Sequence, residues 1–387
     1  MVNRILIVAG EASGDLHGSS LISEYAALHP ETRFLGVGGE RMAAAGCEIL
    51  VPSEQVAVMG FVEVIRHFPE IWRAFQTLKR VLYGPERPQS LVLIDFPEFN
   101  LRLARHAQRA GVPVLYYVSP QVWAWRQGRV RKIARLVDAL AAIFPFEPKL
   151  YAGLDIDVRY IGHPLLDEFA SESGQRDLRS ALEIEAGLPV VGLFPGSRRS
   201  ELSAMLETLV VTARQIVLRK PEVRFVVPIA ATLRSAGIAE LLPDDLPVDL
   251  VDIRDISIYD IARGCDAVLT VSGTVTLQIA LAGTPMAIFY KLAPLSYALG
   301  KRLVRVKHIG LVNIVAGKEI VPEFIQEQAN PDRLSEAILG LLDDKAEQLR
   351  IREELAAVRQ QLGEPGSAAR VAGMLDQLVQ SRQAQKV

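Results

Sequence analysis

Two glycine-containing turns that each follow a short apolar run constrain the fold of this chain more than any other feature. Residues 5–9 lead into GEASGD at 10–15, and residues 190–194 lead into PGSR at 195–198. An apolar run that ends in small residues is typical of a buried parallel strand entering a helix. Such a turn points backbone N–H groups at an anion. We therefore expect an α/β protein with two Rossmann-like, doubly wound domains that face each other across a cleft.

Alternating strand-like and helix-like stretches agree with this organisation, and 387 residues is a length typical of two domains. In the first half, strands are expected at residues 4–8, 33–36, 91–94, 113–118, 139–143 and 158–161. In the second half, they are expected at residues 190–194, 224–228, 248–251, 267–270 and 286–290. A small, polar segment at 171–175 predicts the linker, which gives domains at 1–172 and 173–387. We expect the C-terminal helices to pack back on the first domain.

Composition excludes several classes of protein. The formal net charge of −2 gives no bulk attraction for nucleic acid. Cys47 and Cys265 lack CxxC spacing, so we expect two buried thiols rather than a disulfide framework or a metal site. No leader-like segment and no apolar run of transmembrane length is found. These features predict a cytoplasmic protein, for which contact with a membrane surface stays open.

Polar side chains follow two strands of the first half. Asp95 comes directly after an apolar strand, where a partly dehydrated carboxylate can act as a general base toward a sugar hydroxyl. Asn100 can cap the helix that follows. The alternative for Asp95 is that it caps its own turn, and Glu98 is the natural alternative base. Glu11 would repel a phosphate, so its turn suits the hydroxyls of a polar acceptor. Its alternative is a helix cap in which Ser13 or Asp15 caps and Glu11 is solvated.

Aromatic and basic residues follow two later strands of the same half. Trp123 and Arg126 lie in SPQVWAWR, where an aromatic face can pack on a sugar ring or an acyl chain and arginine can pair with phosphate. The alternative is that the tryptophans are core residues and the basic run is solvated. His163 ends another strand, and it fits a substrate contact and a capping or hinge role equally well.

The second half offers two cradles for a diphosphate. Gly196, Ser197 and Arg198 supply N–H groups and a guanidinium that can neutralise a departing nucleoside diphosphate. One and two turns further along this helix lie Glu201 and Met205. Ser272, Gly273 and Thr274 form the second cradle at another strand–helix junction. No DxD pair follows these strands, so no metal is expected.

Apolar residues recur at three- and four-residue steps between residues 59 and 82, with basic residues beside them. This pattern predicts an amphipathic helix that faces either the core or a membrane surface with acyl chains. Pro69 is expected to break or kink it. The stripe comprises Val62, Ile65, Phe68, Ile71, Trp72 and Phe75.

Seven segments, in order and with compatible spacing from about residue 4 to about residue 330, resemble the lipid-A-disaccharide synthases. Each motif is weak alone, but the series is specific. This family belongs to the GT-B glycosyltransferases. The segments are AGEASGD at 9–15, IDFPEFN at 94–100, YVSPQVWAWR at 117–126, IGHP at 161–164, PGSRRSE at 195–201, SGTVTL at 272–277 and LVN at 311–313.

The resemblance implies transfer of 2,3-diacylglucosamine from its UDP carrier to 2,3-diacylglucosamine 1-phosphate, giving a β-1,6-linked disaccharide 1-phosphate and UDP. The family's important residues would fall on Glu11, Asp95, Arg198, Met205 and, on the uridine side, Asn313. The family usually has an acid, which contacts the ribose in related GT-B enzymes, where this chain has Gln278. An uncharged Gln278 can still accept a hydrogen bond from a ribose hydroxyl.

The partners implied are the two acylated sugars and the lipid surface of the inner membrane, on whose cytoplasmic face the protein would lie peripherally. Neither a cofactor nor nucleic acid is expected, and a homodimer stays open. Two alternatives remain at this point. One is another GT-B enzyme of UDP-sugars, such as an epimerase or a cell-wall N-acetylglucosaminyltransferase. The other is a nucleotide-sugar-binding protein of the membrane surface without turnover.

Overall fold

The structure, a computed structural model, describes residues 3–56, 67–125, 127–196, 199–229, 238, 242–243, 245–292, 297 and 306–384. The chain divides into two compact units. Unit 1 comprises residues 1–164 together with 364–387, and unit 2 comprises residues 165–363. Each unit contains one parallel sheet with helices between its strands. This confirms the expected α/β class with two Rossmann-like domains.

Unit 1 is built on a sheet with the order β3-β2-β1-β4-β5-β6-β7, in which every neighbouring pair is parallel. The chain starts in the middle, winds outward to β3, and then crosses back to β4 beside β1. This reversal is the topological switch point of a doubly wound sheet. The strands are β1 (Arg4–Ala9), β2 (Arg33–Gly38), β3 (Cys47–Pro52), β4 (Ser90–Ile94), β5 (Val114–Tyr117), β6 (Ala139–Ala142) and β7 (Asp157–Tyr160).

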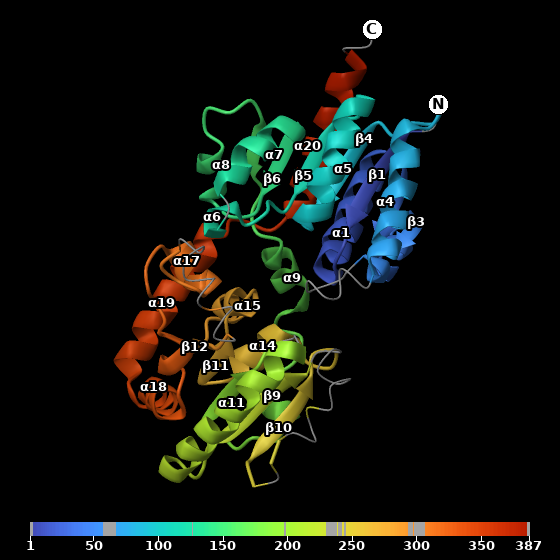
Figure 1. The fold of residues 1–387 in the computed structure, drawn as a ribbon. Helices are drawn as coiled ribbons and strands as arrows, with labels where there is room; N and C mark the ends of the chain where they lie inside the picture. Colours follow the sequence, from blue (N-terminus) through green and yellow to red (C-terminus); the bar gives the residue numbers. More distant parts are fainter. Residues whose placement is uncertain are drawn as a thin grey trace. The chain divides into compact units, whose positions relative to one another are not determined.

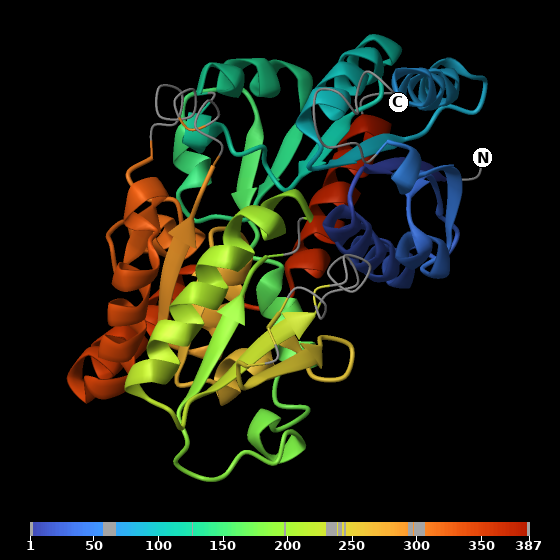
Figure 2. The ribbon, with the colours of Figure 1, turned by 60° about the horizontal axis from the view of Figure 1, so that its bottom comes forward.

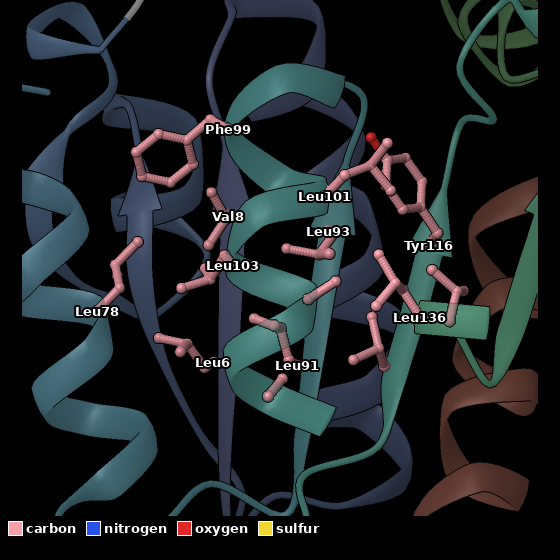
Figure 3. Packing of buried hydrophobic residues seen from close by; sticks show 14 of the residues in the cluster. Leu6, Val8, Leu78, Leu91, Leu93, Phe99, Leu101, Leu103, Tyr116 and Leu136 are labelled. Carbon is pink, nitrogen blue, oxygen red and sulfur yellow. The ribbon is translucent and has the colours of Figure 1, made fainter. Parts of the chain in front are cut away.

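Helices cover both faces of this sheet. Side chains alternate between the faces along each strand, so Leu6 and Val8 with Leu91 and Leu93 point to one side. Figure 3 shows these side chains beneath the apolar face of α5, with Leu78 of α4 beside them. The helices of unit 1 are α1 (Ala12–Leu28), α2 (Glu40–Ala44), α4 (Phe68–Tyr83), α5 (Pro97–Ala110), α6 (Val122–Trp125), α7 (Val130–Leu136), α8 (Glu147–Leu150) and α20 (Ser367–Ala384).

The last helix, α20, packs against α1 and against β4, β5 and β6, as expected for the C-terminal helices (Figure 1). The expectation was wrong for the helix before it, α19 (Lys345–Gln361), which belongs to unit 2. The predicted boundary between 172 and 173 lies at the C-terminal end of α9 (Leu165–Glu172), whereas the two units divide at its N-terminal end. The second predicted domain, 173–387, also included α20, which belongs to unit 1.

Unit 2 repeats the same winding with the strand order β10-β9-β8-β11-β12-β13. In Figure 2, α11 lies along this sheet. The strands are β8 (Val190–Phe194), β9 (Arg224–Ile229), β10 (Val248–Asp252), β11 (Ala267–Val271), β12 (Met286–Tyr290) and β13 (Glu323–Ile325). The helices are α9, α10 (Leu178–Ala181), α11 (Arg199–Arg219), α14 (Ile258–Gly264), α15 (Val275–Ala282), α17 (Leu311–Ala316), α18 (Pro331–Asp343) and α19 (Lys345–Gln361).

Three local features predicted from the sequence are Pro69 in the 59–82 segment, two buried cysteines and the lack of a transmembrane helix. α4 begins at Phe68, so Pro69 lies in its first turn, where proline is well tolerated. The part of the predicted helix before this turn, up to residue 66, lies outside the described residues, so the expected break at Pro69 stays a prediction. Cys47 and Cys265 are buried and free, as predicted. In the part of the chain that the structure describes, no helix is both long and apolar enough to cross a membrane.

Candidate active site

The switch points of the two sheets bring the predicted site residues of each unit together. In unit 1, Ala9 pairs with Ile94, so Glu11 and Asp95 leave neighbouring strand ends. In unit 2, β8 pairs with β11, so the turns at Gly196 and Ser272 leave neighbouring strand ends in the same way. Ligands of open α/β sheets bind beyond the carboxyl ends of strands at these points.

The turn after β4 holds Asp95 in an unusual backbone conformation. Asp95 and Phe96 have φ angles of 43° and 47°, in the left-handed region, which aspartate tolerates but which is strained for phenylalanine. Two donors fix the Asp95 carbonyl: Asn100 Nδ2 at 2.7 Å and the Tyr116 hydroxyl at 2.5 Å. These bonds use only the backbone of Asp95. The strained turn therefore leaves its carboxylate available for chemistry.

The surroundings of Asp95 make it a base suited to neutral pH. Burial raises the pKa of its carboxyl to about 6, the charge of nearby Glu11 raises it further in the same direction, and the Phe96 N–H opposes the rise. A base whose pKa lies just below the working pH is ionised and still accepts a proton well. Glu98, the predicted substitute, is exposed and forms an ion pair with Arg129.

Glu11 is the N-cap residue of α1, but its side chain makes no capping bond. Asp15 does not cap its own helix either. Its carboxylate accepts from the N–H groups of Gly39, Arg41 and Met42 at 2.6–3.1 Å and so caps α2. Asp15 therefore caps α2, and not α1 as the capping alternative predicts. The side chain of Ser13 is exposed at the start of α1.

Close packing of α1 on the sheet depends on glycine. A Cβ at Gly14 would lie 3.2 Å from Ala9 Cβ, and one at Gly18 would lie 2.6 Å from Met42 Sδ. A side chain at Gly14 would crowd the end of β1, whereas one at Gly18 would require the Met42 side chain of α2 to move. Gly14 therefore helps to set the position of the Glu11 turn beside β1.

The segment after β5 places Trp123 in the core. Its ring is 8% exposed and meets Phe144 and Phe146 edge to face, with centroids 5.9 and 5.5 Å apart. This favours the structural alternative for Trp123. Arg126 lies outside the described residues. His163 is also buried, and burial together with nearby His17 lowers its pKa to about 3, so it is neutral at physiological pH.

Glu147, which the sequence gave no reason to select, is a buried acid in this region. One oxygen accepts from the N–H groups of Ile143 and Phe144, each at 3.0 Å. Among the described residues, its other oxygen has no hydrogen-bond partner, and neither has Trp123 Nε1. Burial raises the pKa of Glu147 to about 7, while the Trp123 and Ser119 side chains nearby lower it. Glu147 thus fixes the backbone that follows β6, and its charge lies close to the Trp123 side chain.

Each phosphate-type turn of unit 2 contains a glycine with a positive φ angle. Gly196 has a φ of 88° and Gly273 a φ of 152°, and a Cβ built on Gly273 would have no neighbour within 4 Å in the described part of the chain. Ser272 Oγ donates to Ile309 O at 2.6 Å, which fixes the second turn. Exposed Thr274 is the N-cap of α15 and makes no side-chain capping bond.

Several predicted site residues of unit 2 are fully buried, and others lie outside the described residues. Met205 is fully buried on α11. Asn313 is fully buried and donates to Val321 O and Glu323, while its Oδ1 accepts from the N–H groups of Ile320 and Val321. All its hydrogen-bonding capacity is used, which favours a role in shaping the site over direct contact. Ser197, Arg198 and the side chain of Glu201 lie outside the described residues.

The apolar stripe of α4 divides into two parts. Ile71 and Phe75 pack on the core of unit 1, as the core alternative predicted. Phe68 and Trp72 are 54% and 53% exposed and stack on each other with ring centroids 6.3 Å apart. Val62 and Ile65 lie outside the described residues.

Comparison with known proteins assigns the chain to a family. The family model of lipid-A-disaccharide synthetase matches residues 5–374. The chain belongs to this family. It is 58% identical over 376 residues to the lipid-A-disaccharide synthase of Syntrophotalea carbinolica, which covers 97% of this chain and 95% of that protein. It is 49% identical over 374 residues to that of Geobacter sulfurreducens, which covers 96% of each. Family membership identifies the chain as a glycosyltransferase enzyme of lipid A disaccharide synthesis.

Solved structures show the same fold at low identity. The UDP-GlcNAc 2-epimerase of Neisseria meningitidis bound to UDP-GlcNAc has a TM-score of 0.66 at 13% identity, over 97% of this chain and 100% of that one. The MnaA–UDP structure of Staphylococcus aureus has a TM-score of 0.65 at 12% identity, over 98% and 97% of the two chains. This chain thus shares its two-domain fold with a UDP-GlcNAc 2-epimerase, so the fold alone does not determine the reaction.

Proposed function

We propose that this enzyme transfers 2,3-diacylglucosamine from UDP-2,3-diacylglucosamine to 2,3-diacylglucosamine 1-phosphate. The products are the β-1,6-linked lipid A disaccharide 1-phosphate and UDP. The observation that carries the proposal is the strained turn at the switch point of unit 1, which places the half-buried carboxylate of Asp95 near the charge of Glu11. A full-length family match supports the choice of substrates.

The first domain would hold the acceptor. Asp95 takes the proton of the acceptor 6-hydroxyl as that oxygen attacks C1 of the donor sugar. The donor is α-linked and the product β-linked, so one displacement inverts C1. Glu11, whose side chain makes no capping bond, orients the acceptor near Asp95. Buried Trp123 and His163 support the wall of this site, and Asn100 holds the turn.

The second domain would hold the donor. As the bond from C1 to the diphosphate oxygen breaks, negative charge builds on UDP. The N-terminal ends of α11 and α15, at the Gly196 and Gly273 turns, stabilise that charge together with Arg198. We assign Asn313 and Met205 to shaping this domain's site, in keeping with their burial.

Release of UDP tests the proposal. Purified protein supplied with both acylated sugars should release UDP and form a disaccharide 1-phosphate, detected by mass spectrometry, and either sugar alone should give neither. UDP formed from the donor alone, or an epimerised sugar, would identify an enzyme of the epimerase kind. A protein that binds UDP and never turns over would be a binding protein.

Catalysis is expected to be independent of divalent metal. The charge on the leaving UDP is met by the Arg198 guanidinium and by two helix N-termini, which are the groups this site offers for that task. Excess EDTA should therefore leave the initial rate unchanged in a UDP-release assay. A rate that EDTA abolishes and magnesium or manganese restores would overturn this prediction.

We further propose that α4 docks on the cytoplasmic face of the inner membrane, where the acylated substrates lie. Phe68 and Trp72 form an exposed aromatic pair at the start of the helix, and exposed His67, Arg73 and Arg80 lie on the same element. Aromatic side chains next to basic ones are typical of helices that lie in the membrane interface. Ile71 and Phe75 anchor the helix to the core behind the pair.

Changing both Phe68 and Trp72 to serine should release the protein from vesicles of anionic phospholipid and raise the KM for acylated acceptor. Because both side chains are more than half exposed, the melting temperature should stay nearly unchanged. Co-sedimentation with vesicles and thermal melting measure the two effects. A matched control changes two exposed leucines of unit 2, Leu218 and Leu349, to serine and should keep vesicle binding. Unchanged vesicle binding in the double aromatic variant would remove the membrane role.

A further inference from the structure

Gln278, which stands where the family that the chain resembles usually has an acid, is hydrogen-bonded to an acid on another helix. Its Nε2 donates to Glu168 Oε1 at 3.0 Å. Gln278 lies on α15 and Glu168 on α9, and both belong to unit 2. The carboxylate absent from position 278 is thus present next to it, supplied by a different element.

A second donor fixes this carboxylate. The hydroxyl of Tyr259, a fully buried residue of α14, donates to the same Glu168 oxygen at 2.8 Å. Burial and the charge of Glu168 raise the pKa of Tyr259, so it remains a donor. No residue in the described part of the chain donates to the other Glu168 oxygen, and both Glu168 and Gln278 are half-buried, with access to solvent. One oxygen is held and the other is free to accept.

The position of the pair fits a nucleotide that is bound by its diphosphate. Gln278 comes one helical turn, about 5.4 Å along the axis, after Thr274 at the start of α15. In a nucleoside diphosphate, the ribose is joined directly to the inner phosphate. A diphosphate bound at the Gly273–Thr274 turn would therefore place its ribose about as far from the turn as Gln278 is. A ribose has two adjacent hydroxyls, which need acceptors, and a carboxylate is the group that nucleotide-binding sheets use for them.

We propose that Glu168 binds the ribose hydroxyls of the nucleotide donor, and that Gln278 and Tyr259 position its carboxylate. The proposal rests on the donor placement proposed above and adds the ribose-recognising residue to it. The free Glu168 oxygen accepts from one hydroxyl, and the Gln278 amide oxygen is placed to accept from the other. The donor site thereby selects ribonucleotides over deoxyribonucleotides.

A comparison of UDP with 2′-deoxy-UDP and 3′-deoxy-UDP tests this directly. A site built to bond a hydroxyl rejects the analogue that lacks it. By titration calorimetry, the wild-type enzyme should bind UDP about tenfold or more tightly than at least one deoxy analogue. Glu168→Gln should bind UDP about tenfold more weakly and show little of that preference. Glu172→Gln, one turn further along α9, is the matched control and should keep it.

The exchange variant Glu168→Gln/Gln278→Glu moves the carboxylate to α15 while keeping a Gln–Glu pair across the two helices. It should recover most of the preference for UDP, which a role for Glu168 in folding alone would not predict. If Glu168→Gln binds UDP and both deoxy analogues more weakly by the same factor, so that the preference for UDP is retained, the proposal is overturned. Wild-type protein that binds UDP without discriminating against either analogue would overturn it too. Wild-type protein that fails to bind UDP at all would instead reject the donor placement on which the proposal rests.

Discussion

Replacing Asp95 by asparagine should lower kcat about 10²- to 10⁴-fold, because the amide keeps the shape of the side chain but cannot accept a proton from the acceptor hydroxyl. The KM values for both substrates should change much less. In the wild type, kcat should fall as the pH drops through about 6, where the carboxyl becomes protonated. Steady-state rates measured between pH 5 and 9 test both statements.

The same variant should be more stable than the wild type at neutral pH. The folded pKa of Asp95 is raised to about 6 from its ordinary value of 3.8, so the folded state holds the proton more tightly than the unfolded state. Stability is therefore lost as the pH rises from about 4 to 6, and the loss above pH 6 corresponds to about 3 kcal/mol. Asp95→Asn removes this penalty. Its melting temperature should exceed that of the wild type at pH 7.5, and the gain should vanish near pH 4.

Glu98 provides the comparison. Its exposed carboxylate is paired with Arg129, so Glu98→Gln should leave kcat within a few-fold of the wild type. Near-normal turnover in Asp95→Asn together with a large loss in Glu98→Gln would transfer the role of base to Glu98.

Replacing Arg198 by alanine should weaken UDP binding and lower kcat by about 10²- to 10³-fold, the effect of removing one well-placed stabiliser of developing charge. Arg198 directly precedes α11, so its guanidinium and the positive end of that helix would act on the same diphosphate. Titration calorimetry with UDP and single-turnover kinetics separate the two effects. Arg219→Ala, at the opposite end of α11, is the matched control. An unchanged affinity for UDP in Arg198→Ala would contradict the placement of the diphosphate.

Most of the fold could be predicted because parallel strands buried on both faces appear as apolar runs. β8 and β12 lie where the runs at 190–194 and 286–290 placed them. The strands that were missed, β3 and β13, lie at the edges of their sheets. β3 is only partly buried and β13 has three residues, so neither leaves a continuous apolar run.

Less of the site could be predicted, because it depends on contacts between distant residues. The position of Asp95 after its strand gave its place at the switch point. The positive φ angle of Asp95 and the hydrogen bond from the Tyr116 hydroxyl to the Asp95 carbonyl, however, depend on the pairing of β4 with β5. Glu147 and Glu168 stand in segments without a recognisable motif, and only packing shows what each one meets. For Asn313, the local sequence could not reveal that its amide is fully used by the backbone at 320–321 and by Glu323.

The stereochemistry of the product tests the central claim most directly. With a donor labelled with ¹³C at C1 of its sugar, NMR of the purified product gives both the anomeric configuration and the linkage position. One displacement assisted by Asp95 predicts a disaccharide 1-phosphate that is entirely β-linked from C1 to the acceptor 6-oxygen, formed in step with UDP. An α-linked product, or labelled free sugar in place of disaccharide, would contradict it.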